Sequence, residues 1–309
     1  MRLVLIGNPG LDRSWKNDLA WAARDLGWHT TVLQDVQVST GDVVSACDGA
    51  GLLIWARSHG RQPRGDIGRM WRQVEAGGTA TAAVHLDLYW GIGRREHEIG
   101  RHPWWQAGTV WTADGGHDHL FAQRGVNHRW LPPPAPDRYV GRAMPRPSQA
   151  CDVLFVGGCS DRVHAGRREL LAWASARYRD GFRWIGARAG QRVWGRDLNG
   201  WYASAKVVLG DSAPAPRYWS DRVPGTAGRG GVLVHPHVDG LADLHGNTVQ
   251  VFRRGDLRGL GVLIDSLLDD PGRRERIRRQ AVTLVRGRHL WRHRLAAIAA
   301  ETVASGVAR

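Results

Sequence analysis

The sequence has almost no lysine, few cysteines and no long apolar segment. Only Lys16 and Lys206 are lysines among 43 basic residues. The three cysteines (Cys47, Cys151 and Cys159) are an odd number without the spacing of a metal site, which favours a reduced, cytoplasmic setting over a disulfide scaffold. No apolar run reaches the about 18 residues of a membrane span, and the opening MRLVLIGNPG has no cleavage-type site. We therefore expect a cytoplasmic globular protein without a transmembrane segment.

Positive charge is concentrated in the second half of the chain. The formal net charge is +14; residues 1–140 carry 15 basic and 14 acidic residues, whereas residues 141–309 carry 28 and 15. Codon bias can exchange lysine for arginine, but it cannot create this excess. A polyanionic partner, if there is one, should therefore contact the second half.

Strands and helices alternate along both halves. The apolar run at 3–6 ends in the turn Gly7-Asn-Pro-Gly10, and apolar residues at helical spacing follow at 15–26. Further strands are expected at 30–33, 51–55, 80–86, 110–112, 127–131, 153–156, 182–185, 206–209 and 232–234, and a mostly helical end at 258–304. This alternation predicts an α/β fold with parallel sheets covered by helices on both faces.

The length of 309 residues suits two domains, and residues 132–150 separate them with six prolines and no periodicity. We expect a Rossmann-like domain over 1–135, a proline-rich linker over 136–150, a second Rossmann-like domain over 151–285 and a C-terminal helix over 286–309. The strand carboxyl ends of two such domains would face a central cleft, where ligands bind.

Several motifs occur in an order that is typical of one enzyme family. The second half contains Val153-Leu-Phe-Val-Gly-Gly158 with Arg167-Arg-Glu-Leu-Leu171, Tyr202-Ala-Ser-Ala-Lys206, Ser220-Asp-Arg222-Val with Gly230-Gly-Val-Leu-Val234 and Asp239-Gly-Leu241, and His289-Leu-Trp-Arg-His-Arg294. The first half adds His85-Leu-Asp87, Trp111-Thr-Ala-Asp114 and Trp130-Leu-Pro-Pro133. In this order they resemble the CgeB-like branch of the family-1-type GT-B glycosyltransferases. The resemblance implies a GT-B fold whose C-terminal helix returns toward the N-terminal, acceptor-binding domain.

One departure from the family pattern concerns an acidic residue. The family block carries a glutamate shortly after the arginine, but here the stretch reads Arg222-Val-Pro-Gly225 and contains no acid. The sugar preference and the stereochemical outcome are therefore open. A degenerate, non-catalytic member of the family is an alternative.

The resemblance and the chemistry of a diphosphate leaving group suggest a donor site in the second domain. The negative charge that develops on the diphosphate needs preorganised donors, which arginine side chains and helix N-termini supply. Arg222 follows two residues of N-cap type and is the strongest expected phosphate ligand. The expected donor-binding residues are Gly10, Gly157, Gly158, Lys206, Ser220, Arg222 and Asp239. The alternative for each of these residues is a structural role in a turn or at the cap of a helix, or a position on the surface without a ligand.

Two further groups of residues are candidates for the acceptor side. His85 and Asp87 end a strand, and either could take the proton of an acceptor hydroxyl; a turn-stabilising aspartate beside a half-buried histidine is the alternative. The segment 273–294 carries nine arginines and one acid. The residues expected to contact a polyanion are Arg273, Arg274, Arg278, Arg288 and Arg292, although a solvated helix face is the usual meaning of such a run.

These observations predict a glycosyltransferase that moves a sugar from a nucleotide sugar, a UDP-sugar first of all, to an acceptor hydroxyl without a cofactor or metal. Phage enzymes that glycosylate hydroxymethylated bases in DNA share the GT-B architecture, and the basic second half suits DNA. We therefore expect DNA with a hydroxymethylated base as the acceptor, in the host cytoplasm if a phage encodes the protein. The alternatives are a small molecule or an envelope or spore polysaccharide as acceptor, and a non-catalytic nucleic-acid-binding protein on a degenerate GT-B fold.

Overall fold

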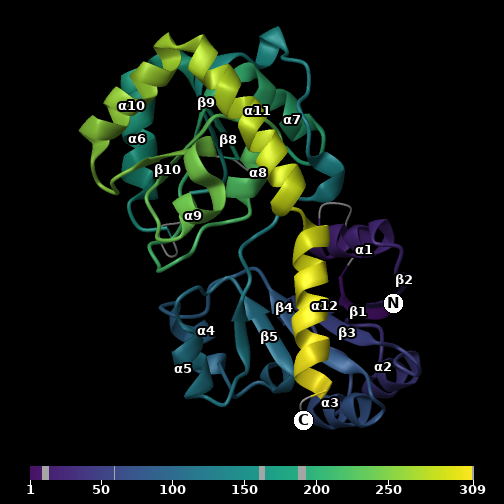
Figure 1. The fold of residues 1–309 in the computed structure, drawn as a ribbon. Coiled ribbons are helices and arrows are strands. Elements are labelled where there is room, and N and C mark those ends of the chain that lie inside the picture. The colour runs from purple at the N-terminus through teal and green to yellow at the C-terminus, as the bar shows by residue number, and fades with distance from the viewer. Residues whose placement is uncertain (9–13, 59, 160–163, 187–192, 308–309) are drawn as a thin grey trace. The chain divides into compact units, whose positions relative to one another are not determined.

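The chain folds into two α/β units, each built on one parallel sheet (Figure 1). The structure is a computed structural model that describes residues 1–8, 14–58, 60–159, 164–186 and 193–307. Unit 1 comprises Met1–Pro132 and Trp291–Arg309, and unit 2 comprises Pro133–Leu290. The predicted α/β class is confirmed. None of the helices in the described residues is long and apolar enough to cross a membrane.

Unit 1 contains a six-stranded parallel sheet in the order β2-β1-β3-β4-β5-β6. Its strands are β1 (Arg2–Gly7), β2 (His29–Gln34), β3 (Leu52–Ala56), β4 (Ala80–His85), β5 (Thr109–Thr112) and β6 (His128–Trp130). β3 reads LLIWA and every one of its residues is buried. A strand covered on both faces needs such a continuous apolar run, which is why the sequence marked these strands clearly.

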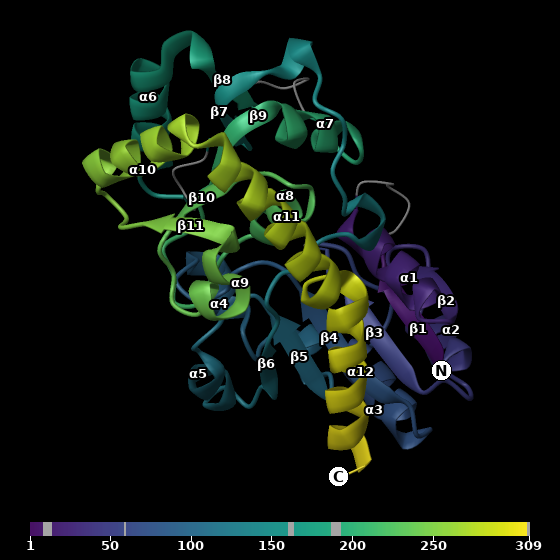
Figure 2. The same cartoon turned by 45° about the horizontal axis from the view of Figure 1, so that its top comes forward.

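Helices cover both faces of the unit 1 sheet. Leu3 and Leu5 face a cluster with α1 (Trp15–Asp25) and α12 (Trp291–Val307), whereas Val4 and Ile6 face the opposite cluster. Figure 2 shows α12 running along the sheet, and Trp291 at its start stacks on Trp15 with ring centroids 5.5 Å apart. The other elements of this unit are α2 (Thr40–Ala46), α3 (Ile67–Ala76), α4 (Gly93–Glu98), η1 (Pro103–Gln106) and α5 (Asp118–Ala122).

Unit 2 contains a five-stranded parallel sheet in the order β11-β10-β9-β7-β8. Its strands are β7 (Cys151–Val156), β8 (Phe182–Ile185), β9 (Ala205–Leu209), β10 (Leu233–Pro236) and β11 (Val249–Phe252). Its helices are α6 (Arg167–Tyr178), α7 (Asp197–Ser204), α8 (Arg222–Gly228), α9 (Leu241–His245), α10 (Leu257–Asp269) and α11 (Pro271–Arg288), with the short turns η2 (Asp137–Tyr139), η3 (Pro147–Gln149), η4 (Arg179–Gly181) and η5 (Gly246–Thr248). The prediction missed α2, α9 and β11, which are short and have weak periodicity.

Both sheets place their first strand between their second and third strands. In unit 1 the connection after β1 runs to β2 on one side, whereas the connection after β3 runs to β4 on the other side. In unit 2 the connections after β7 and β9 diverge in the same way. The carboxyl ends of such a strand pair form a topological switch point, where open α/β sheets bind ligands. The fold therefore gives each unit one preferred ligand position.

The chain passes between the units twice, and the two passing segments are tied to their own units. In unit 2 the Ala135 N–H donates to the His289 carbonyl oxygen at 2.7 Å, and in unit 1 Arg294 Nε donates to the Pro132 carbonyl oxygen at 2.7 Å. The predicted linker over 136–150 is anchored on unit 2, because Asn199 donates to two of its carbonyl groups. The helical segment expected over 286–309 is divided between the end of α11 and the whole of α12.

Arg278 of α11 is buried and holds unit 2 together. Its guanidinium donates to the carbonyl oxygens of Tyr202, Ala205, Lys206 and Gly230, where α7 leads into β9 and where α8 has ended. Burial lowers its pKa to about 10, so it stays charged at neutral pH. Arg278 is therefore unable to contact a polyanion, and that prediction is corrected.

We expect Arg278→Ala to lower the free energy of unfolding by about 3 kcal/mol or more, because several buried carbonyl groups lose their donor. Arg279→Ala is the matched control, since Arg279 is the next residue and its side chain is 67% exposed. Its effect should stay within about 0.5 kcal/mol. Thermal unfolding of both variants measures this, and equal midpoints would contradict the structural role of Arg278.

Candidate functional site

Two loops at the carboxyl edge of the unit 2 sheet meet at its switch point. β7 ends at Val156 and leads into Gly157, and Asp211 lies two residues beyond the end of β9. Gly157 has a φ of +147°, which favours glycine. A Cβ atom on it would lie 2.3 Å from Nη1 of Arg222. Glycine at this position therefore leaves the room that the guanidinium occupies.

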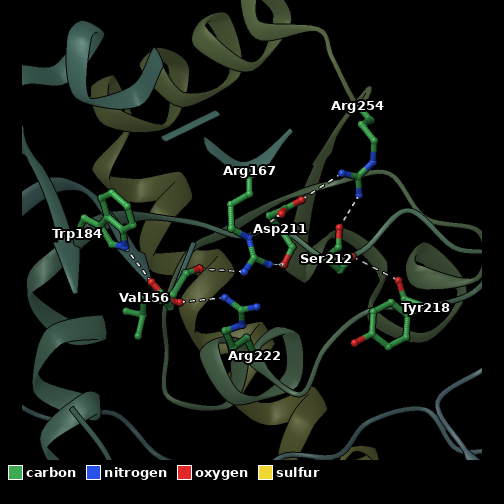
Figure 3. A network of polar contacts seen from close by, with 10 residues as sticks. Val156, Arg167, Trp184, Asp211, Ser212, Tyr218, Arg222 and Arg254 are labelled. Atoms are coloured by element: carbon green, nitrogen blue, oxygen red, sulfur yellow. Dashed lines mark hydrogen bonds and ion pairs between the residues drawn. The ribbon is translucent and has the colours of Figure 1, made fainter. Parts of the chain in front are cut away.

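Arg222 begins α8 and carries positive charge to this edge. Its Nη1 donates to the carbonyl oxygen of Val156 at 3.1 Å (Figure 3). Asp221, one of the two residues of N-cap type, is the N-cap residue of this helix, but its side chain makes no capping hydrogen bond. The side chain of Arg222, and not the end of this short helix, is thus the relevant feature.

The carboxylate of Asp211 is buried between two further arginines. Arg167 Nε lies 2.9 Å from Asp211 Oδ2, and Arg254 Nη1 lies 3.1 Å from Oδ1 (Figure 3). Arg167 is 3% exposed and also donates to the carbonyl oxygen of Gly158 at 3.1 Å. Arg254 donates to the carbonyl oxygen of Ser212 at 2.9 Å, and its side chain is 35% exposed. Both guanidiniums are thereby fixed in place.

Among the described residues, three guanidiniums lie close to the carboxylate of Asp211, so their charges outnumber its own. Burial lowers the pKa of Arg167, and the neighbouring charge of Arg222 adds to that effect. Burial, followed by the charges of Arg167 and Arg222, also lowers the pKa of His164 to about 4, so this histidine is neutral at pH 7. Such an arrangement suits an anion with more than one negative charge, for example a diphosphate.

A narrow pocket beside Arg222 reaches down to a buried histidine. Polar groups of Asp211, Ser220, Arg222 and His235 line it, and it has room for a single water-sized group, about 10 Å³. His235 is 1% exposed, and its Nδ1 lies 2.7 Å from the Pro236 carbonyl oxygen. Among the described residues, His235 Nε2 has no hydrogen-bond partner. Burial lowers the pKa of His235 to about 4, which keeps the ring neutral.

Unit 1 has a polar cluster at the carboxyl end of β4. His85 is 5% exposed; its Nδ1 lies 2.8 Å from Tyr89 Oη and its Nε2 lies 3.7 Å from the Asp87 carboxylate. Arg57 Nη1 also donates to Tyr89 Oη, at 3.3 Å. Asp87 also pairs with Arg95 at 3.2 Å and its side chain is 44% exposed.

This geometry separates the two predicted catalytic residues. His85 lies behind Asp87 and is held by Tyr89, so burial argues against His85 as the group that meets an acceptor. His85 Nε2 lies 3.7 Å from the Asp87 carboxylate, which also pairs with Arg95. Asp87 stays the candidate base.

The remaining predicted donor ligands have different positions. Lys206 is the second residue of β9 and therefore lies at the sheet edge opposite to Asp211; its Nζ pairs with Asp152 Oδ1 at 2.8 Å. This position corrects the prediction that Lys206 binds the donor. Asp239 is exposed in the turn after β10, on the same edge as Arg222. Gly10 lies outside the described residues.

The five arginines predicted to contact a polyanion do not form one surface. Arg278 and Arg274 are directed onto backbone carbonyl groups, and Arg273 donates to a glutamine side chain. Arg288 is exposed at the end of α11, whereas Arg292 belongs to unit 1. Of the predicted set, these placements leave Arg288 as the exposed basic residue of unit 2.

Sequence reasoning missed the partners that organise the site. Asp211 follows an apolar strand by two residues, a position that points to a carboxyl-end loop, and this signal was available. Arg254 follows β11, which was not predicted, and His235 looks like an ordinary strand residue. Within the described ranges, no three His, Cys, Asp or Glu side chains are arranged to hold a metal ion.

The fold and the site together define an α/β protein of two Rossmann-like units with a cluster of arginines at the carboxyl edge of the unit 2 sheet. The comparisons identify it further. Residues 159–300 match the family model described as glycosyl transferase-like. No curated protein sequence matches the chain significantly.

Solved structures match over both units. An α-glucosyltransferase in complex with UDP and a 13-mer DNA containing an HMU base has a TM-score of 0.69 and 9% identity, covering 100% of both chains. Sucrose-phosphate synthase from Thermosynechococcus elongatus has a TM-score of 0.61 and 12% identity, again covering 100% of both chains. T4 phage BGT in complex with UDP-glucose has a TM-score of 0.60 and 12% identity, covering 100% of this chain and 98% of that chain.

The chain is therefore a glycosyltransferase with the GT-B fold, as the order of its motifs predicted. The family match supplies the enzyme class, and the structural matches supply the fold. The narrower assignment to the CgeB-like branch stays a prediction.

We expect Asp211→Asn to destabilise unit 2 by about 3 kcal/mol, because it leaves the buried guanidinium of Arg167 without its counter-charge. Asp265→Asn is the matched control; Asp265 pairs with Arg177 on the surface, and its loss should cost about 1 kcal/mol or less. Urea unfolding followed by tryptophan fluorescence measures both. Equal losses of unfolding free energy would show that the buried ion pair of Asp211 stabilises the protein no more than the surface ion pair of Asp265.

Proposed function

We propose that this glycosyltransferase uses a nucleoside-diphosphate sugar and binds its diphosphate at the carboxyl edge of the unit 2 sheet. The observation that carries the proposal is that Arg167 and Arg254 pair with Asp211 while Arg222 lines the same pocket and donates to the Val156 carbonyl oxygen. When the bond between sugar and phosphate breaks, negative charge develops on the diphosphate. Fixed guanidiniums with an excess of positive charge stabilise that charge without rearranging.

The three arginines have different tasks in this proposal. Arg222 and the partly exposed Arg254 bind the phosphate oxygens directly. Arg167 is almost fully buried, so it positions Asp211 and the loop of Gly158 instead. Gly157 and Gly158 allow the ligand and the Arg222 side chain to come close to the backbone.

A UDP-sugar is the first donor to consider. Two of the similar structures hold UDP or UDP-glucose, and their match in fold supports the same nucleotide here. On the acceptor side, Asp87 would take the proton of the attacking hydroxyl, with His85 and Arg95 holding its carboxylate.

DNA with a hydroxymethylated base is our proposed acceptor. The net charge of the second half supports it, and so does the similar α-glucosyltransferase that holds DNA with an HMU base. The contact surface differs from the predicted one, however. Arg276, Arg279 and Arg286 are exposed on α11, and their spacing of three and seven residues places them on one face. Three phosphates of a DNA backbone could pair with this row.

We expect Arg222→Ala to weaken UDP-glucose binding by about ten- to a hundredfold, the factor that hydrogen bonds to a charged group supply. Arg258→Ala is the control, because Arg258 is an exposed arginine on α10. Isothermal titration calorimetry with UDP-, GDP-, ADP- and dTDP-sugars measures binding and names the nucleotide. Wild-type protein that binds none of them would contradict the proposed donor.

The acceptor is tested by transfer of radiolabelled sugar to duplex DNA that carries 5-hydroxymethyluracil or 5-hydroxymethylcytosine, with unmodified DNA as the control. We expect label only in the modified duplexes. Replacing Arg276, Arg279 and Arg286 together by alanine should reduce the slope of log binding constant against log salt by about 2 to 3. Label in a small glycoside but in neither modified DNA would refute the DNA acceptor and leave the donor proposal intact.

A further inference from the structure

The pocket beside Arg222 ends in a hydrogen-bond acceptor that the protein leaves unused. Because His235 Nδ1 lies 2.7 Å from a carbonyl oxygen, which can only accept, Nδ1 carries the hydrogen of the neutral ring. Nε2 then has a lone pair. This atom is buried and has no partner among the described residues, and His235 is one of the residues that line the pocket. A buried acceptor of this kind needs a donor from a ligand or a water.

A second residue of the pocket lining, Ser220, also carries a buried polar atom. Ser220 Oγ is also buried and, in the part of the chain that the structure describes, has no hydrogen-bond partner. A hydroxyl group can both donate and accept. Among the described residues that line the pocket, these two buried polar atoms are the ones without a partner; one must accept a hydrogen bond and the other can donate or accept.

The size and charge of the pocket narrow the occupant. Its room for one water-sized group, about 10 Å³, excludes a base or a sugar ring. A phosphate oxygen has no hydrogen to offer His235 Nε2, and the surrounding arginines repel an ammonium group. A single hydroxyl group meets all of these conditions.

We infer that this pocket, the hydroxyl pocket of His235 and Ser220, receives one hydroxyl group of the nucleotide sugar. The hydroxyl donates to His235 Nε2 and accepts from Ser220 Oγ while the adjacent diphosphate lies on Arg222. This inference rests on the proposed donor site. The hydroxyl comes from the ribose or from the transferred sugar, which share this chemistry.

The test compares binding of UDP-glucose, UDP and inorganic pyrophosphate to wild type, His235→Phe, His235→Gln and Ser220→Ala by calorimetry. His235→Phe keeps a ring and removes the acceptor, whereas His235→Gln keeps an acceptor. We expect His235→Phe and Ser220→Ala to weaken UDP-glucose binding by about five- to tenfold, the factor for one hydrogen bond between neutral groups. His235→Gln should restore most of it, and pyrophosphate, which has no hydroxyl group, should bind all four proteins equally.

The pattern of losses distinguishes the sources. Equal weakening of UDP and UDP-glucose assigns the ribose, and weakening of UDP-glucose alone assigns the transferred sugar. Unchanged binding of both ligands by His235→Phe and Ser220→Ala would show that a water alone fills the pocket and would overturn the inference. If the unfolding midpoint shows that His235→Phe does not fold, the binding of UDP-glucose by Ser220→Ala tests the inference instead. Wild-type protein that binds neither nucleotide sugars nor pyrophosphate would instead refute the proposed donor site.

Discussion

The ion pairs of one buried carboxylate hold the candidate donor site together. Asp211 has lost its water and must be paired, and Arg167 and Arg254 provide that pairing from α6 and from the end of β11. One negative charge cannot neutralise these two guanidiniums and Arg222 as well. The site therefore keeps its excess of positive charge in a fixed geometry, which is the condition for stabilising a diphosphate as it leaves.

The strand order explains why the site forms where it does. β7 and β9 lie side by side although β8 separates them in the chain, so the loops that follow them meet at one edge. The backbone of Gly157, with a φ of +147°, favours glycine, and a Cβ atom there would displace the end of the Arg222 side chain. In unit 1 the polar cluster lies at the end of β4, the strand next to β3, where Asp87 pairs with Arg95 and lies close to His85.

The abundance of arginine serves two purposes that composition does not separate. Arg278 and Arg294 are turned inward and donate to backbone carbonyl groups, and burial lowers the pKa of each to about 10. They stabilise the units that contain them. Arg276, Arg279 and Arg286 are exposed and give α11 its basic face. Only the second group can meet a polyanion, so net charge alone overstated the surface available for one.

The sequence by itself determined the α/β class, most of the strands, the glycine turn after β7 and the position of Arg222 at the start of a helix. These follow from apolar periodicity, turn residues and ordered motifs, which are properties of neighbouring residues. Tertiary structure alone decided that Asp211 pairs with Arg167, which is 44 residues away in the chain. It also placed Lys206 at the sheet edge opposite to Asp211 and buried Arg278 and His235. Strand order and burial set these contacts, and neither is encoded in the local pattern of residues.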